Sequence, residues 1–304
     1  MAIRPRPGKE AVEAKGWLRA NKWLILRRLS QFGILGLFLL GPLAGVWIVK
    51  GNLAYSYTLD FLPLSDPHIL LQSVLAGVEP HKDAIIGVVI VTVFYMLIGG
   101  RVFCSWVCPV NLVTDLACCT RRMLGIRTST QLSRNARYWL LGVTLLLPLV
   151  TGTIVWEMFN PVSMAFRGLL FGLGLAWVIL LGIFLFDIFV SKEGWCGRLC
   201  PVGAFYSLLG RKSLVRVVAT DRDKCDDCMD CFEVCPEEQV IRPALKGADK
   251  GLSPVILSSQ CTNCGRCIDV CAEDVFHFGL RSHKQSDKGV EAVKTGAEKL
   301  EDAA

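Results

Sequence analysis

The chain has 304 residues, of which 52% are hydrophobic and 20% charged, and it carries a formal net charge of +6. Its mean hydropathy of +0.45 is positive although its carboxyl-terminal part is polar, so the apolar residues must be concentrated upstream in a membrane domain. The basic residues cluster beside hydrophobic segments without any basic and aromatic recognition motif, which argues against a nucleic-acid-binding protein.

Residues 1–28 form a basic tail in which only Glu10 and Glu13 are acidic. A tail of this kind is expected to stay on the cytoplasmic side of a membrane. Long apolar stretches follow, each near the length of about 20 residues that a bilayer core requires. They predict four transmembrane helices, at residues 29–49, 84–100, 138–156 and 168–190.

Basic residues are frequent between residues 101 and 137 but sparse in the loops before and after that segment. By the positive-inside rule, both termini and the middle loop are cytoplasmic, and the other two loops face the opposite side. We therefore expect a multi-pass protein of a bacterial inner membrane. Its carboxyl-terminal region is expected to lie in the cytoplasm.

The second and fourth apolar stretches each lead into a C-x3-C-P motif, formed by Cys104 and Cys108 in the first half and by Cys196 and Cys200 in the second. The matched offset predicts that residues 29–216 form a membrane domain of two parallel hairpins. The four cysteines could bind a shared metal centre, cycle as redox thiols, or dock a partner's cluster. Alternatively, cysteine is a small apolar filler where a helix ends before proline.

Residues 217–280 contain two runs with the spacing C-x2-C-x2-C-x3-C. In two-cluster ferredoxins the fourth cysteine of such a run ligates the other cluster. This rule predicts two [4Fe–4S] clusters, one held by Cys225, Cys228, Cys231 and Cys271, and the other by Cys261, Cys264, Cys267 and Cys235. Zinc sites or a disulfide framework are the alternatives, but the tight spacing favours reduced thiolates.

The predicted fold is therefore a membrane α-helical domain followed by an α+β two-cluster ferredoxin-like domain at residues 217–280 and a charged, mobile tail at residues 281–304. Glu157 and Asp187 lie near helix ends, and carboxylates at membrane depth are candidate proton acceptors. The adjacent Cys118 and Cys119 are expected to be structural.

The histidines are expected to be surface residues, because none of them lies inside a hydrophobic stretch; they are His68, His81, His277 and His283. The sequence has neither axial histidines at membrane depth nor a C-x-x-C-H attachment motif, so no haem is evident.

Over nearly its whole length the chain resembles the NapH family, the ferredoxin-type membrane components of quinol dehydrogenases that serve periplasmic nitrate reductase. Both cluster runs contribute to the resemblance, together with Lys15-Gly16-Trp17, Phe103-Cys104-Ser-Trp-Val-Cys108-Pro109, Gly194-Trp195-Cys196 and Cys200-Pro201-Val202-Gly203-Ala204. It implies a subunit that takes electrons from menaquinol or ubiquinol and passes them, with a soluble iron–sulfur partner of the NapG type, towards a periplasmic reductase. Membrane proteins of methylamine utilisation and nitrous-oxide reduction share parts of the pattern.

Three functions fit these features. The first is an electron-transfer subunit that oxidises quinol, and the second is a membrane polyferredoxin that assembles metal centres through its C-x3-C-P thiolates, which suit Cu(I). The third is a membrane anchor that docks soluble redox partners. Cytoplasmic clusters cannot reach a periplasmic acceptor across a core about 30 Å thick. Either quinone carries electrons between the faces, or the clusters serve another purpose.

Overall fold

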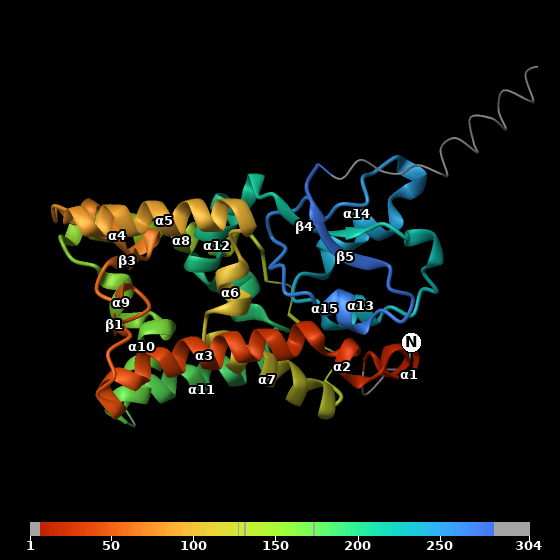
Figure 1. Cartoon of the computed structure of the whole chain (residues 1–304), viewed down its shortest axis with the longest axis horizontal. Coiled ribbons are helices and arrows are strands. Elements are labelled where there is room, and N and C mark those ends of the chain that lie inside the picture. Colours follow the sequence, from red (N-terminus) through yellow and green to blue (C-terminus); the bar gives the residue numbers. More distant parts are fainter. Residues whose placement is uncertain (1–6, 127, 131, 173, 283–304) are drawn as a thin grey trace, which may run out of the picture.

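The computed structural model describes residues 7–126, 128–130, 132–172 and 174–282. In Figure 1 a helical region occupies one end of the long axis and a ferredoxin-like region occupies the other. The predicted tail lies outside the described residues from residue 283 onward, and so does His283.

The helical region contains four longer helices that run along the long axis (Figure 1): α3 (Lys22–Ala44), α5 (Lys82–Ile98), α8 (Ala136–Thr151) and α11 (Leu175–Phe189). Shorter elements connect them and fill the space between them: α4 (Pro67–Leu75), α6 (Val102–Trp106), α7 (Val110–Met123), α9 (Val155–Phe159), α10 (Pro161–Phe171), a π-helix (Trp195–Leu199), α12 (Pro201–Leu209) and a 3-10 turn (Gly210–Lys212). Helix α7 packs against α11, and α12 packs against α8.

The prediction of four transmembrane helices in two parallel hairpins is wrong. Among the helices of the described residues, α3, with 23 residues, is the one that is long and apolar enough to cross a bilayer. Helices α5, α8 and α11 have 17, 16 and 15 residues. These lengths fall short of the roughly 20 residues that a hydrocarbon core requires.

Glycines in left-handed or related backbone conformations divide the apolar stretches into these shorter helices. Gly152, with φ of 65°, ends α8 before the predicted boundary, and Gly172, with φ of 90°, ends α10. The stretch predicted as one helix at residues 168–190 is therefore shared between α10 and α11. Glycine adopts positive φ without a steric penalty, so a run of apolar residues can turn at these positions.

A small antiparallel sheet occupies the segment between α3 and α4, at the end of the molecule away from the ferredoxin-like region (Figure 1). It consists of β1 (Val49–Gly51), β2 (Tyr55–Thr58) and β3 (Leu62–Ser65), and Ser56 is paired with Leu64. Strand β3 lies against α5, where a Cβ atom on Gly87 would be 2.8 Å from Ser65 Oγ. This glycine permits the close approach of the sheet to the helix.

The ferredoxin-like region is built on an antiparallel pair of strands, β4 (Val215–Ala219) and β5 (Phe276–Leu280). Its short helices are α13 (Asp230–Val234), α14 (Ile241–Lys246) and α15 (Arg266–Val270), with 3-10 turns at Arg222–Lys224, Glu238–Val240 and Ala248–Lys250. Val217, Ile241 and Phe276 lie in one buried core together with Cys231 and Cys267. The cysteine loops are therefore packed on the only sizeable apolar core that we find in the described part of this region.

The basic amino-terminal segment docks on the ferredoxin-like region through α1 (Lys9–Lys15) and α2 (Trp17–Ala20). Lys15 Nζ donates to the carbonyl oxygens of Ile268 at 3.0 Å and Cys271 at 2.7 Å. The Asp269 carboxylate accepts hydrogen bonds from the backbone N–H groups of Trp23 at 3.0 Å and Leu24 at 2.9 Å, the free donors at the start of α3. The amino-terminal segment and the cysteine loops thus lie at the same end of the molecule.

Candidate metal centres

The two cysteine runs at the carboxyl end fold into loops of the same backbone shape. The third residues of the runs, Asp227 and Asn263, have φ of 62° and 49°, and the fifth residues, Met229 and Gly265, have φ of 64° and 73°. Non-glycine residues seldom adopt positive φ, so its recurrence at matched positions is a specific feature of the two loops. The repeat in the sequence is therefore also a repeat in the backbone.

Each loop borders a small cavity. The cysteines around the first cavity are Cys225, Cys228, Cys231 and Cys271. Those around the second cavity are Cys235, Cys261, Cys264 and Cys267. Three cysteines of one run are thus brought together with the last cysteine of the other run, the grouping that the crossed-ligation rule describes.

A third small cavity lies in the helical region, where it is bordered by Cys104, Cys108, Cys196 and Cys200. The first two cysteines belong to α6 and the turn after it, and Cys196 belongs to the π-helix, a rare conformation that is frequent at functional sites. Aromatic side chains of Phe103, Trp156 and Trp195 complete the wall. The two C-x3-C-P motifs, distant in sequence, therefore meet around one cavity.

Burial sets the electrostatics of these thiols. It raises the pKa of Cys200 and of Cys261 to about 11, and that of Cys231 to about 12, with neighbouring cysteines adding to the effect. Thiols of this kind give up their protons when a cation binds and stabilises the thiolates. Four soft sulfur donors around one cavity fit an iron–sulfur cluster or zinc, and they exclude the oxygen-loving cations magnesium and calcium.

A buried ion cluster ties the third cavity to the second. Glu237 Oε1 accepts from Arg101 Nη1 at 2.7 Å and from Arg137 Nη1 at 3.1 Å, and all three side chains are at most 2% exposed. Arg101 Nη2 also donates to the carbonyl oxygen of Cys196 at 3.0 Å. Burial opposes ionisation of Glu237, but the charges of Arg101 and Arg137 outweigh it and lower the pKa of this carboxyl group. Glu237 lies two residues after Cys235, so the cluster connects loops from both cavities.

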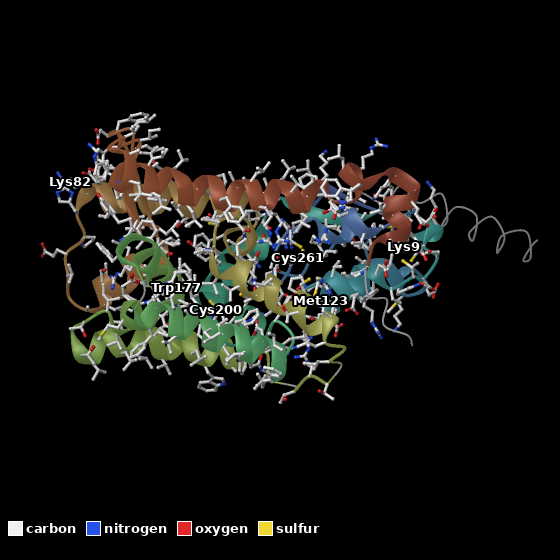
Figure 2. The ribbon with its side chains drawn as sticks, turned by 90° about the horizontal axis from the view of Figure 1, so that it is seen from below. Lys9, Lys82, Met123, Trp177, Cys200 and Cys261 are labelled. Carbon is white, nitrogen blue, oxygen red and sulfur yellow. The ribbon has the colours of Figure 1, made fainter. Side chains whose placement is uncertain are left out.

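The same loops are also joined by direct hydrogen bonds. Ser105 Oγ donates to the carbonyl oxygen of Thr262 at 2.8 Å, and Trp106 Nε1 donates to that of Asn263 at 3.1 Å. Ser105 and Trp106 lie between Cys104 and Cys108, and their partners lie between Cys261 and Cys264. Figure 2 places Cys261 on the Lys9 side of Cys200 along the long axis. The second and third sites are therefore neighbours across the junction of the two regions.

The two predicted proton acceptors lie away from the cysteine cavities. Asp187 is fully buried and accepts from the Trp195 N–H at 3.0 Å, and burial raises its pKa to about 7. Glu157 is half-buried in α9 and accepts from Asn160 Nδ2 at 3.1 Å. Neither carboxylate borders one of the three cysteine cavities.

His68 is not a surface residue, and that part of the histidine prediction is wrong. It is fully buried in α4, where its ring lies 5.3 Å from that of Phe205 and 3.1 Å from Gln72 Nε2. Burial lowers its pKa to about 4, so it is neutral. Cys118 is buried and donates to Glu193 Oε1 at 3.3 Å, whereas Cys119 is half-buried.

Sequence reasoning missed Arg101 and Glu237, because Arg101 was interpreted as a topology charge and Glu237 follows a cluster run among other acidic residues. It also missed Asp66, although an aspartate before Pro67 is a recognisable start of a helix and Asp66 caps α4. The pairing of an arginine with a glutamate so far along the chain has no local signal.

Comparison with known proteins shows what the cysteine sites resemble. A family model described as a 4Fe-4S binding domain matches residues 81–126 and 173–217, which include the third cavity's cysteines, and a 4Fe-4S dicluster domain model matches residues 224–275. No solved structure matches the chain significantly.

Among curated proteins, the ferredoxin-type protein NapH of Haemophilus influenzae is 51% identical over 92% of this chain and 98% of its own length, and NapH of Escherichia coli has the same identity and coverage. The methylamine utilization ferredoxin-type protein MauN of Paracoccus denitrificans is 55% identical over 83% of this chain and 88% of its own length. The family resemblance seen in the sequence is confirmed: the chain belongs to the NapH family and is a ferredoxin-type electron-transfer protein with 4Fe-4S-binding domains.

Proposed function

We propose that this protein is a membrane-bound subunit that takes electrons from a quinol and passes them through three four-cysteine sites to a soluble iron–sulfur partner. The observation that supports it is the arrangement of the three cavities, each bordered by four cysteines, with the loops of the second and third in direct hydrogen-bond contact. A linked set of such sites suits stepwise electron transfer.

Each cavity would hold one [4Fe–4S] cluster, a cofactor that exchanges one electron at a time. The proposed ligands of the first two sites are Cys225, Cys228, Cys231 and Cys271, and Cys261, Cys264, Cys267 and Cys235. The proposed ligands of the third site are Cys104, Cys108, Cys196 and Cys200. Arg101 fixes the carbonyl of Cys196, and the buried ion cluster holds the loops of the second and third sites together.

The first site is the natural exit to a soluble partner. Cys225 and Cys228 are half-exposed, and the exposed carboxylates around them, Glu10, Asp223, Asp226 and Asp227, outnumber the neighbouring cations Lys224 and Lys246. Surface charges of one sign steer an oppositely charged partner to a docking site. A soluble iron–sulfur protein of the NapG type would present basic residues here.

The helical region would associate with the bacterial inner membrane through α3. Leu29, Phe32 and Leu43 of this helix are 64%, 61% and 77% exposed, and Trp139 and Val150 of α8 are also largely exposed. Apolar patches of this extent signal contact with lipid or protein. The basic amino-terminal segment and the ferredoxin-like region share one end of the molecule, and the positive-inside rule would put that end in the cytoplasm.

The terminal acceptor would be the periplasmic nitrate reductase system, as the NapH relatives suggest. MauN relatives of similar identity bear names from methylamine utilisation, so the test must include that system. Deleting the gene in its host should abolish growth on nitrate as the electron acceptor. Normal nitrate growth with a loss of growth on methylamine would replace nitrate reduction with the second pathway.

The electron-transfer proposal is tested on detergent-purified, anaerobic protein. Three loaded sites correspond to about twelve irons per chain, and a quinol analogue should reduce the clusters detected by electron paramagnetic resonance. Cys228→Ser and Cys104→Ser should each remove one cluster signal, whereas Cys119→Ser, outside the four-cysteine cavities, should remove none. Clusters that no quinol reduces would refute the proposal. Tight Cu(I) binding that depends on Cys104 would instead support a role in metal-centre assembly.

A further inference from the structure

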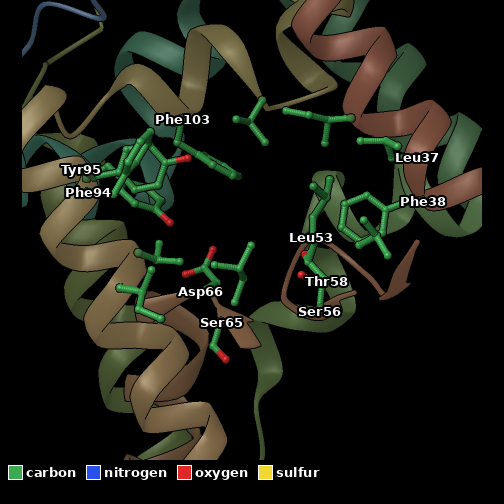
Figure 3. A pocket seen from close by; sticks show the side chains of 17 residues that line it. Leu37, Phe38, Leu53, Ser56, Thr58, Ser65, Asp66, Phe94, Tyr95 and Phe103 are labelled. Atoms are coloured by element: carbon green, nitrogen blue, oxygen red, sulfur yellow. The ribbon is translucent and has the colours of Figure 1, made fainter. Parts of the chain in front are cut away.

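A cavity of about 410 Å³ lies between α3, the small sheet and α5 (Figure 3). Its wall is mostly apolar and includes Phe38 from α3, Leu53 from the sheet segment and Phe94 from α5. The volume lies in the range of about 300–1,000 Å³ that is usual for small-molecule sites. The cavity can therefore accept the ring of a small organic ligand.

The mouth of this cavity is apolar. Leu37, Ile90 and Phe94 border the cavity and are 38%, 37% and 49% exposed, so they also form the outer surface between α3 and α5. Another cavity, of about 550 Å³, lies beside Cys104, Cys196 and Cys264, and charged side chains such as Arg28 and Asp115 make its wall less suited to an apolar molecule. A ligand with a hydrocarbon chain would enter the apolar cavity from the side of α3, the candidate membrane helix.

Polar groups gather on the inner side of the cavity. Asp66, 9% exposed, projects into it opposite Leu37 and Phe38 (Figure 3). The neighbouring Ser65 hydroxyl is buried and has no hydrogen-bond partner among the described residues. Apolar walls with one buried carboxylate and one unsatisfied hydroxyl fit a ligand that has both a hydrocarbon part and hydroxyl groups.

Phe103 connects this cavity with the third cysteine site. Its side chain borders both the apolar cavity and the cavity around Cys104. The ring of Phe103 stacks on that of Tyr206, with centroids 5.0 Å apart and 19° between the planes. A ligand ring in the apolar cavity would therefore be separated from the cysteine site by one aromatic side chain.

We propose that this apolar cavity binds the quinol ring, with its hydrocarbon tail leaving between Leu37 and Phe94, and that Asp66 accepts the quinol's protons. This inference rests on the proposed function, which supplies the electron acceptor. The quinol loses both hydroxyl hydrogens and becomes a quinone. Its two electrons pass one at a time to the iron–sulfur acceptor proposed at Cys104 and its companions, and its two protons go in turn to the Asp66 carboxylate, which releases the first to water before it accepts the second.

The surroundings of Asp66 are suited to reversible protonation. Burial is the main effect on the Asp66 carboxyl group and raises its pKa to about 6, and the charge of Glu157 also raises the pKa. Hydrogen bonds from the backbone N–H groups of His68 and Ile69 and from Tyr206 act in the opposite direction. The other titratable groups facing it are Tyr95, which stays neutral, and the neutral His68 ring. A carboxylate in this range can accept a proton near neutral pH and release it again.

The test compares Asp66→Asn with Asp60→Asn in otherwise complete, cluster-loaded protein. Asparagine is as good a helix cap as aspartate, so Asp66→Asn keeps the cap of α4 and removes the charge. Asp60 is an exposed turn residue with φ of 61°, a conformation that asparagine tolerates. Reduction of the clusters by decylubiquinol should slow about 100-fold or more in Asp66→Asn, and stay unchanged in Asp60→Asn. Reduction of both variants by dithionite should match wild type.

A second measurement follows binding without electron transfer. An azidoquinone should label peptides from residues 34–38, 49–66 or 82–107, and Val91→Trp, which fills the cavity, should abolish labelling that Asp66→Asn retains. Wild-type clusters that no quinol reduces would refute the proposed function. Wild-type reduction that persists unchanged in Asp66→Asn, or labelling outside the cavity, would refute this assignment and leave the proposed function standing.

Discussion

Arg101 donates to Glu237 at 2.7 Å across the junction between the helical and the ferredoxin-like regions, and both side chains are almost completely buried. Because Arg101 also holds the carbonyl oxygen of Cys196, one side chain positions the loops of two cysteine sites. The junction is therefore a buried ionic contact between the two regions.

Replacing Arg101 with alanine should strongly destabilise this junction. Glu237 would keep Arg137 but lose its shorter ion pair, and breaking a buried pair costs about 3–5 kcal/mol. Chemical denaturation of the detergent-solubilised protein should show that loss. Lys50→Ala, which breaks the exposed pair with Asp60, should change the free energy of unfolding by less than about 1 kcal/mol. Equal effects of the two substitutions would contradict the structural role of the buried cluster.

Asp269→Ala should release the amino end of α3 from the ferredoxin-like region. The substitution removes the acceptor for the Trp23 and Leu24 N–H groups, and loss of a helix cap costs about 0.5–2 kcal/mol. Hydrogen exchange should become faster at these two amides. Asp274→Ala, which loses the bond to Lys15 at an exposed site, should leave both amides protected. Unchanged protection in Asp269→Ala would show that the cap is dispensable.

Gly265→Ala should disturb the second cysteine loop. A Cβ atom there would lie 2.6 Å from Cγ of Trp23, and the residue also has φ of 73°. Gly251→Ala is the matched control, because φ is 64° but no atom lies within 4 Å of the added Cβ. We expect Gly265→Ala to lower the iron content by about one third, the content of one of the three proposed cluster sites, and Gly251→Ala to keep the full iron content. Full iron loading of Gly265→Ala would mean that the Trp23 contact adapts.

The buried Asp66 should make the protein's stability fall as pH rises through the acid range. Its pKa is raised from 3.8 to about 6, so the folded state binds the proton more tightly than the unfolded state does. This contribution to the free energy of unfolding is about 3 kcal/mol. It is fully present below the unfolded-state pKa of 3.8 and is lost between about pH 4 and 6. The difference between wild type and Asp66→Asn should show this dependence, since asparagine does not titrate. A difference that is constant from pH 4 to 7 would contradict the raised pKa.

The same group should shape the pH dependence of quinol oxidation. If Asp66 must be ionised to accept a proton, the rate of cluster reduction by quinol should rise with a midpoint near pH 6. Stopped-flow absorbance would measure it. The rise in rate near pH 6 should be absent in Asp66→Asn and partly present in Asp66→Glu. A wild-type profile that is flat from pH 5 to 7 would count against the proton acceptor.

Local spacing allowed the cysteine runs to be recognised, since the positive φ values at Asp227 and Asn263 belong to loops that the C-x2-C-x2-C spacing defines. Too many membrane helices were predicted because a hydropathy average over an apolar stretch does not reveal a single glycine at which the helix ends. Gly152 and Gly172 turn the chain within apolar stretches, and neither looks different from the helical Gly142 in the sequence.

Long-range partners had no such local signal. The sheet from Val49 to Ser65 is made of short strands in a segment expected to be a loop, so the cavity that it forms with α3 and α5 could not be foreseen. Asp66 became a candidate only when the structure placed it in that cavity. Likewise, the meeting of Cys104 with Cys196 follows from the packing of helices far apart in the chain.

The cap of α3 also has a consequence for biosynthesis. Trp23 and Asp269 are 246 positions apart, so this helix leaves the ribosome long before the residue that completes its amino end. During translation, the Trp23 and Leu24 N–H groups of α3 therefore lack this acceptor until nearly the whole polypeptide has been made. Chains that stop before Asp269 would lack the acceptor for both of these N–H groups.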